Sequence, residues 1–128
     1  MDSVGIVIIG RNEGDRLKAC LESLHGLKVS IAYVDSGSTD GSVALAKQYT
    51  QHIVELDSHK PFSAARARNE GSVKLIKLHP RIKYIQFIDG DCTLSPGWIK
   101  AAAHALDANP RLAAVTGHLL EKNPDHSI

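Results

Sequence analysis

Two acidic residues, Asp89 and Asp91, stand on either side of Gly90 directly after the apolar run 84–88. Carboxylate oxygens are hard ligands that favour Mg²⁺ or Mn²⁺ over softer metals, and the glycine lets the backbone turn so that both side chains face one point. A cation held there would bridge diphosphate oxygens and offset the charge on a leaving nucleoside diphosphate. A polar surface turn is the alternative for the triplet taken alone.

A third carboxylate, Asp35, ends the apolar run 29–34 and precedes the small residues 36–41. Small residues let a ligand approach the backbone closely, and this carboxylate could accept hydrogen bonds from a base N–H or from ribose hydroxyls. For residues 38–40 a second interpretation stays open, in which the segment is a turn and one side chain caps the next helix.

These residues need a scaffold that brings them to one edge, and the apolar pattern predicts one. The expected strands span residues 4–9, 29–34, 53–56, 84–88 and 112–120, and the expected helices lie near 17–24, 42–49, 63–78 and 96–108. This alternation predicts an α/β domain with a mainly parallel sheet, in which ligands bind beyond the carboxyl ends of the strands. The run 84–88 is apolar enough for a central strand, which would deliver Asp89 and Asp91 into the ligand crevice.

Composition excludes several classes of protein. The 128 residues carry a net charge of only +1, with Lys and Arg scattered along the chain, so nucleic acid is not an expected partner. No apolar run is long enough to span a bilayer and no basic signal-like start is present, which favours a cytoplasmic domain without a membrane segment. The two cysteines have no metal-ligand spacing and are expected to be free thiols.

The segment 34–42, Val-Asp-Ser-Gly-Ser-Thr-Asp-Gly-Ser, resembles the Val-Asp-Asp-Gly-Ser-Thr-Asp-Gly-Thr segment of family-2 glycosyltransferases, which have the GT-A fold. Three further segments match in family order: Arg-Asn-Glu at 11–13, Ala-Arg-Asn-Glu-Gly at 67–71 and Phe-Ile-Asp-Gly-Asp at 87–91. The resemblance implies a three-layer, Rossmann-like GT-A sheet, mainly parallel and truncated. Residues 1–121 would form the nucleotide-sugar-binding subdomain, and the polar tail 122–128 would lead to a missing acceptor-binding portion.

The resemblance also implies roles for particular residues. The implied nucleotide-binding residues are Arg11, Asn12, Glu13, Asp35, Ser36, Arg68 and Asp89, and the implied metal ligands are Asp91 and Asp89, which would hold Mn²⁺ or Mg²⁺. Many relatives carry Pro-x-Tyr-Asn after the first strand, with the Tyr near the base. Arg11 could stack on the base in its place, or it could be a solvated loop charge.

Arg66 and Arg68 lie two residues apart, so their side chains diverge by about 200° on a helix and only one can readily face the crevice. The position of Arg68 in the matching segment favours that residue, and Arg66 would then be a surface charge.

The implied function is metal-dependent, inverting transfer of a sugar from a nucleotide diphosphate sugar to a saccharide or lipid-linked acceptor, as in polysaccharide biosynthesis. No convincing catalytic base is present, because Glu121 and Asp125 lie in or beside the tail. We therefore expect a fragment with weak or no transfer activity, from a parent protein that could sit at the cytoplasmic face of the membrane. The alternative is a non-catalytic nucleotide-binding or interaction module of the same fold, and the sequence does not indicate the oligomeric state.

Overall fold

The computed structural model describes residues 3–120, which divide into two compact units, one ending at Pro96 and one beginning at Gly97. The first unit is built on a parallel sheet of four strands in the order β3-β2-β1-β4. The strands are β1 (Val4–Gly10), β2 (Ser30–Asp35), β3 (His52–Glu55) and β4 (Tyr84–Asp89). The predicted α/β class with a parallel, Rossmann-like sheet is confirmed.

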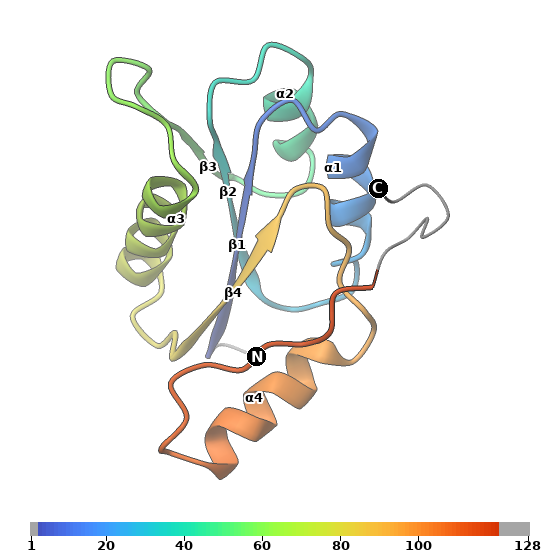
Figure 1. Cartoon of the computed structure of the whole chain (residues 1–128), viewed down its shortest axis with the longest axis vertical. Helices are drawn as coiled ribbons and strands as arrows, with labels where there is room; N and C mark the ends of the chain where they lie inside the picture. Colours follow the sequence, from blue (N-terminus) through green and yellow to red (C-terminus); the bar gives the residue numbers. More distant parts are fainter. Residues whose placement is uncertain (1–2, 121–128) are drawn as a thin grey trace. The chain divides into compact units, whose positions relative to one another are not determined.

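Helices cover both faces of this sheet (Figure 1). One face carries α3 (Ala64–Leu78), and the other carries α1 (Asp15–Glu22) and α2 (Ser42–Ala46). The central strand β1 is buried from Val4 to Ile9 because it is sandwiched between these layers, which explains its continuous apolar sequence.

The helix α3 packs unusually close to the sheet. A Cβ atom added at Gly71 would lie 2.5 Å from Cγ1 of Val7 and 2.9 Å from Cγ2 of Val34, so only glycine fits at this crossing. Ser63 caps the helix, because its hydroxyl accepts a hydrogen bond from the backbone N–H of Arg66 at 3.0 Å. This capped end of α3 lies at the same edge of the sheet as the carboxyl ends of the strands.

Strand order reverses beside β1. The chain adds β2 and β3 on one side of β1 and then returns to add β4 on the other, so the reversal lies between β1 and β4. In open parallel sheets this point forms the ligand crevice. The expectation that 84–88 is a central strand is wrong for the four strands of this unit, because β4 pairs only with β1.

The second unit contains α4 (Trp98–Ala108), which begins after Gly97 and not at residue 96 as expected. The predicted strand at 112–120 does not form. Instead, Gly117 packs against Trp98, where an added Cβ would lie 3.2 Å from the indole ring. The predicted tail 122–128, together with Glu121, lies outside the described residues.

Candidate functional site

A cavity of about 330 Å³ opens at the carboxyl ends of β1 and β4, next to the first turn of α3. Six of the residues singled out from the sequence line it: Arg11, Glu13, Ser36, Arg68, Asp89 and Asp91. They come from four separate segments of the chain, which the parallel topology brings to one edge. The cavity therefore lies where the strand order reverses, as expected from the sheet.

The turn that carries Asp89 and Asp91 is fixed against β1. Its central residue, Gly90, donates a backbone hydrogen bond to the carbonyl of Ile9 at 2.8 Å, and a Cβ at Gly90 would lie only 3.2 Å from that oxygen. The N–H of Cys92 closes the turn by donating to the carbonyl of Asp89 at 2.9 Å. Both carboxylates are exposed and line the cavity.

The donor set at this turn suits a hard cation. Two carboxylates can supply part of the oxygen shell that Mg²⁺ or Mn²⁺ prefers, and the remaining positions would go to water or to a bound ligand. Within residues 3–120 there is no cluster of three or more His, Cys, Asp or Glu side chains that could enclose a metal. Asp89 and Asp91 therefore fit a cation that takes its other ligands from water or a bound molecule.

Arg68 points from α3 into the cavity and pairs with Asp89, with Nη2 3.2 Å from Oδ1. Arg66 does not line the cavity, because its Nη1 donates to the backbone carbonyls of Asp57, Lys60 and Pro61 at 3.0, 3.1 and 3.3 Å. The prediction that only one of the two arginines faces the crevice, and that it is Arg68, is confirmed. Arg66 instead holds the segment before α3 in place.

Phe62 is a cavity residue that the sequence reasoning missed. The guanidinium carbon of Arg11 lies 5.9 Å from the centroid of its ring. The ring also packs over Gly37, where an added Cβ would come within 3.0 Å of it. Gly37 has a φ of 78°, which suits glycine. The available signal was an aromatic residue directly ahead of the Ser63 cap, which places it at the entrance to the helix.

Asn12 does not line the cavity. Its side-chain oxygen accepts hydrogen bonds from the backbone N–H groups of Thr39 and Asp40 at 2.7 and 3.3 Å, and its own N–H donates to the hydroxyl of Ser38 at 2.9 Å. Its φ of 51° is one that asparagine tolerates better than most residues. Asn12 therefore ties the loop after β1 to the loop after β2.

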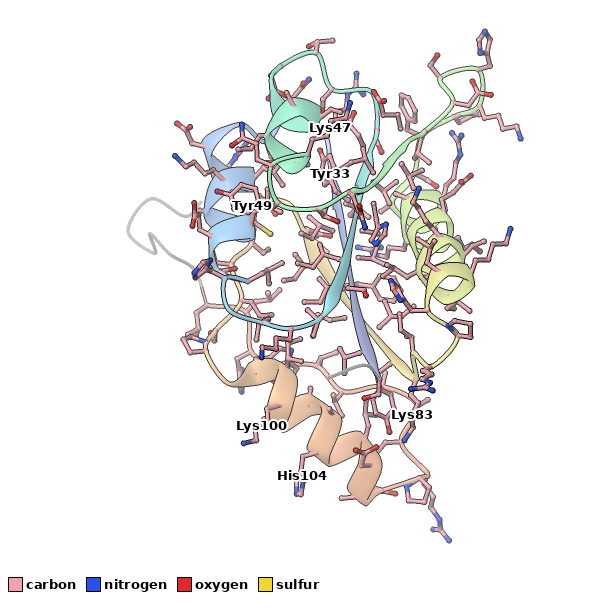
Figure 2. The ribbon with its side chains drawn as sticks, turned by 180° about the vertical axis from the view of Figure 1, so that it is seen from behind. Tyr33, Lys47, Tyr49, Lys83, Lys100 and His104 are labelled. Atoms are coloured by element: carbon pink, nitrogen blue, oxygen red, sulfur yellow. The ribbon has the colours of Figure 1, made fainter. Side chains whose placement is uncertain are left out.

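Asp35 is also absent from the lining and is only 2% exposed. Its carboxylate accepts hydrogen bonds from the hydroxyl of Tyr33 at 2.6 Å and from the backbone N–H and hydroxyl of Ser38 at 2.7 and 2.6 Å. Figure 2 shows Tyr33 in the interior near α2, and burial, followed by the hydrogen bond to Asp35, raises the pKa of its phenol. Asp35 thus fixes the shape of the loop that carries Ser36.

Of the residues 38–40 that could have capped α2, Asp40 meets the helix start, because its Oδ1 accepts from the N–H of Ser42 at 2.9 Å. Hydrogen bonds from Ser42 hold the pKa of this exposed carboxyl below its ordinary value. The N-cap position of α2 is Gly41 and has no side-chain cap, so Asp40 forms a turn ahead of the helix and none of residues 38–40 is its N-cap. Ser38 and the N–H of Thr39 take part in the network that joins the two loops.

Comparison with known proteins identifies the family. Residues 5–126 match the family model described as Glycosyl transferase family 2. The chain belongs to glycosyl transferase family 2. It is 32% identical over 100 residues, 74% of its length, to an Escherichia coli (strain K12) protein named "Uncharacterized glycosyltransferase YibD", of which it covers 28%.

The fold of this family-2 chain also matches a solved structure, S. aureus TarS, with a TM-score of 0.64 and 18% sequence identity. That match covers 94% of this chain and 23% of TarS. The chain thus spans about a quarter of the length of both proteins, and the TarS likeness concerns the fold alone. No helix within residues 3–120 combines the length and apolar character needed to cross a membrane.

Both cysteines of this family-2 domain are free thiols, as predicted. Cys20 lies beneath the acidic turn, with Sγ 4.0 Å from the carbonyl of Asp89, and burial raises its pKa to about 12. Burial also raises the pKa of Cys92, ahead of its hydrogen bond to Asp91. Neither thiol is therefore prepared for nucleophilic chemistry at neutral pH.

Proposed function

We propose that this domain binds a nucleoside-diphosphate sugar together with a divalent cation, as the donor-binding part of an inverting, metal-dependent glycosyltransferase. The observation that carries the proposal is the cavity at the β1–β4 reversal, which gathers the carboxylates of Asp89 and Asp91 with the guanidinium of Arg68. Carboxylates that hold a cation and an arginine that faces phosphate are complementary to a diphosphate.

The charge of the cavity favours metal dependence. Its charged lining consists of three carboxylates and two guanidiniums, and Glu13 is neutralised by an ion pair with Arg16 at 3.2 Å. Without a further positive charge, a diphosphate would meet the Asp89 and Asp91 carboxylates with little net attraction. A bound Mn²⁺ or Mg²⁺ would supply that charge and stabilise the leaving diphosphate.

Within this proposal, Asp91 is the direct metal ligand. Its carboxylate is exposed on the turn, and Cys92 Sγ lies 3.5 Å from its Oδ1. Asp89 would be the second ligand of the cation, and its ion pair with Arg68 would hold the arginine toward the ribose or phosphates. Ser36 and Glu13 form the walls beside the nucleoside.

The base is proposed to stack between Arg11 and Phe62. A flat ring inserted between two planes needs about 7 Å, which is two van der Waals contacts of about 3.5 Å each. The guanidinium carbon of Arg11 lies over the Phe62 ring, 5.9 Å from its centroid, and a base would take the place of this contact as the exposed Arg11 swings outward. Asn12 and Asp35 hold in place the loops on either side of the space between Arg11 and Phe62. A direct contact of Asp35 with the base would require Ser38 to move, because Ser38 donates two hydrogen bonds to the Asp35 carboxylate.

The complete reaction would use a saccharide or lipid-linked acceptor and a carboxylate base, for which we assign no residue in this chain. We expect the 128-residue chain to bind donor and metal and to transfer sugar weakly or not at all. A longer protein that binds nucleotide but fails to transfer sugar would instead favour the non-catalytic module. We also propose that the domain is cytoplasmic.

Calorimetry tests the donor site directly. The chain is titrated with UDP, GDP, CDP and dTDP, with and without Mn²⁺, and we expect binding that depends on the cation. The variant Asp91→Asn should lose the effect of the cation, and Asp107→Asn, which lies outside the cavity lining, should keep it. Failure of all four nucleotides to bind in the presence of Mn²⁺ or Mg²⁺ would refute the proposal.

A further inference from the structure

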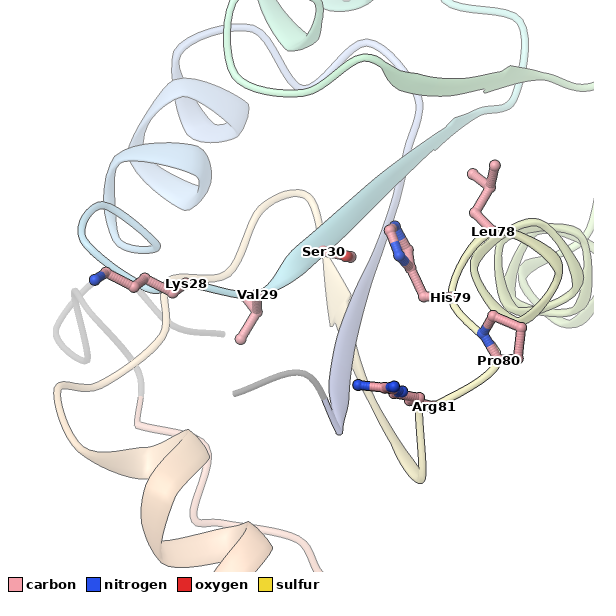
Figure 3. Close-up of a pocket in the computed structure, with 7 residues that line it drawn as sticks. All are labelled: Lys28, Val29, Ser30, Leu78, His79, Pro80 and Arg81. Atoms are coloured by element: carbon pink, nitrogen blue, oxygen red, sulfur yellow. The ribbon is translucent and has the colours of Figure 1, made fainter.

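A second cavity, of about 480 Å³, lies at the opposite edge of the sheet from the acidic turn (Figure 3). It is enclosed by residues 28–30, where β2 begins, and by residues 78–81, where α3 ends. Six residue steps along β1 separate the two edges of the sheet, a distance of about 20 Å at roughly 3.3 Å per residue. A ligand in this cavity would therefore not touch the proposed donor.

The charged residues in the lining are all positive. They are Arg81 and Lys28, and no carboxylate lines the cavity. Arg81 is exposed and has no hydrogen bond or ion pair with the rest of the described chain, and Figure 3 shows its guanidinium extending toward the β1 ribbon near the start of that strand. Lys28 points away from the other labelled residues, which leaves Arg81 as the main cation of the site.

Two further polar groups lie beside this cation. The imidazole of His79 points toward Ser30 in Figure 3, and an edge-to-face contact with His52, at 5.8 Å between centroids, supports the ring. Nε2 of His79 is buried and has no hydrogen-bond partner within residues 3–120. Buried polar atoms normally have a partner, so a rotation of the imidazole that turned this nitrogen to a ligand oxygen in the cavity would satisfy it.

The remaining walls are apolar, formed by Val29, Leu78 and Pro80, and Leu78 is 49% exposed. The cavity is larger than a simple inorganic anion requires and falls within the range of about 300–1,000 Å³ typical of small-molecule sites. The end of α3 carries partial negative charge, which disfavours an anion there. Binding of an anion would therefore depend on Arg81.

We propose that the cavity between the start of β2 and the end of α3 binds a small organic anion, a carboxylate or phosphate monoester with an apolar body. Arg81 pairs with the anionic group, His79 and Ser30 bind its oxygens, and the apolar walls receive the body. The site is separate from the donor cavity, so its occupation does not require nucleotide or metal.

Amide NMR spectra of the ¹⁵N-labelled chain provide the test. The probes are phenyl phosphate and benzoate, with benzyl alcohol as the neutral analogue and inorganic phosphate as the anion without a body. We expect saturable shifts at residues 28–30, 79 and 81 with one or both organic anions. Their affinity should exceed that of benzyl alcohol and of inorganic phosphate by about tenfold, and comparison of the two anions tells a carboxylate site from a phosphate site.

The variant Arg81→Gln should weaken binding by about tenfold or more, because it removes a charge-assisted contact. Its unchanged spectrum elsewhere would show that it folds. The matched control, Arg111→Gln, changes an exposed arginine outside the cavity and should bind as the unmodified chain does. Absence of saturable shifts with both anions, equal binding by Arg81→Gln, or equal affinity for either reference compound would overturn the proposal.

Discussion

Replacement of Asp91 by asparagine is the sharpest test of the donor site. The change keeps the size of the side chain and removes one negative charge from the exposed turn. Two unit charges about 4 Å apart in water interact by about 1 kcal/mol, and a divalent ion doubles this to about 2 kcal/mol. Because Asp91 is exposed, the aqueous value applies, and we expect about a 30-fold loss of cation-dependent affinity.

The measurement is calorimetric titration of a nucleoside diphosphate in the presence and absence of Mn²⁺, at one fixed ionic strength. Without the cation, Asp91→Asn should bind no more weakly than the unmodified chain, since it lacks a carboxylate that repels phosphate. Equal cation-dependent affinity in both proteins would mean that Asp91 does not hold the metal, and the proposed roles of the turn would fail.

Three further predictions concern the stacking of the base, the packing of α3 and the response to pH. Phe62→Leu should lower nucleoside-diphosphate affinity by about 5- to 150-fold, the equivalent of about 1–3 kcal/mol of stacking, while Mn²⁺-pyrophosphate binding stays the same; calorimetry with both ligands checks this. Gly71→Ala should lower the free energy of unfolding by about 1–3 kcal/mol, because the new methyl overlaps Val7, whereas Gly41→Ala, which meets nothing within 4 Å, should change it far less in urea titrations. Burial, followed by the charges of His79 and Lys74, lowers the pKa of His52 below 6.5, so the folded state binds fewer protons than the unfolded state and stability should fall as the pH drops below 6.5. A melting temperature that falls equally in His52→Gln would contradict this assignment.

The strands β1 and β2 could be predicted from the sequence because their apolar runs are short and nearly continuous, as buried parallel strands require. The strands β3 and β4 stand at the edges of this four-stranded sheet and are only partly buried, yet their apolar residues still marked their positions. The common direction of the four strands then brings Arg11, Ser36, Asp89 and Asp91 to one edge, so most of the cavity lining follows from local pattern and topology together. The divergence of Arg66 and Arg68 was equally predictable, since helical geometry alone separates them.

Other features depend on contacts that no local pattern encodes. The edge position of β4 follows from long-range pairing, and an apolar segment such as 112–120 forms a strand only where a neighbour accepts it. The sequence marked Asn12 and Asp35 as polar residues after strands, but their hydrogen bonds to residues 38–40 emerge only when two loops meet. Phe62 becomes a cavity residue through its packing over Gly37, which is 25 positions away in the chain.

The bridge that Asn12 forms between neighbouring loops makes two walls of the crevice behave as one piece. Its side chain and backbone contact three successive residues, 38–40, so neither loop can open while these bonds hold. Removing this side chain would free both loops to move, and a ligand would then have to order the two loops as it binds. A single short side chain thereby holds the two loops in one fixed arrangement.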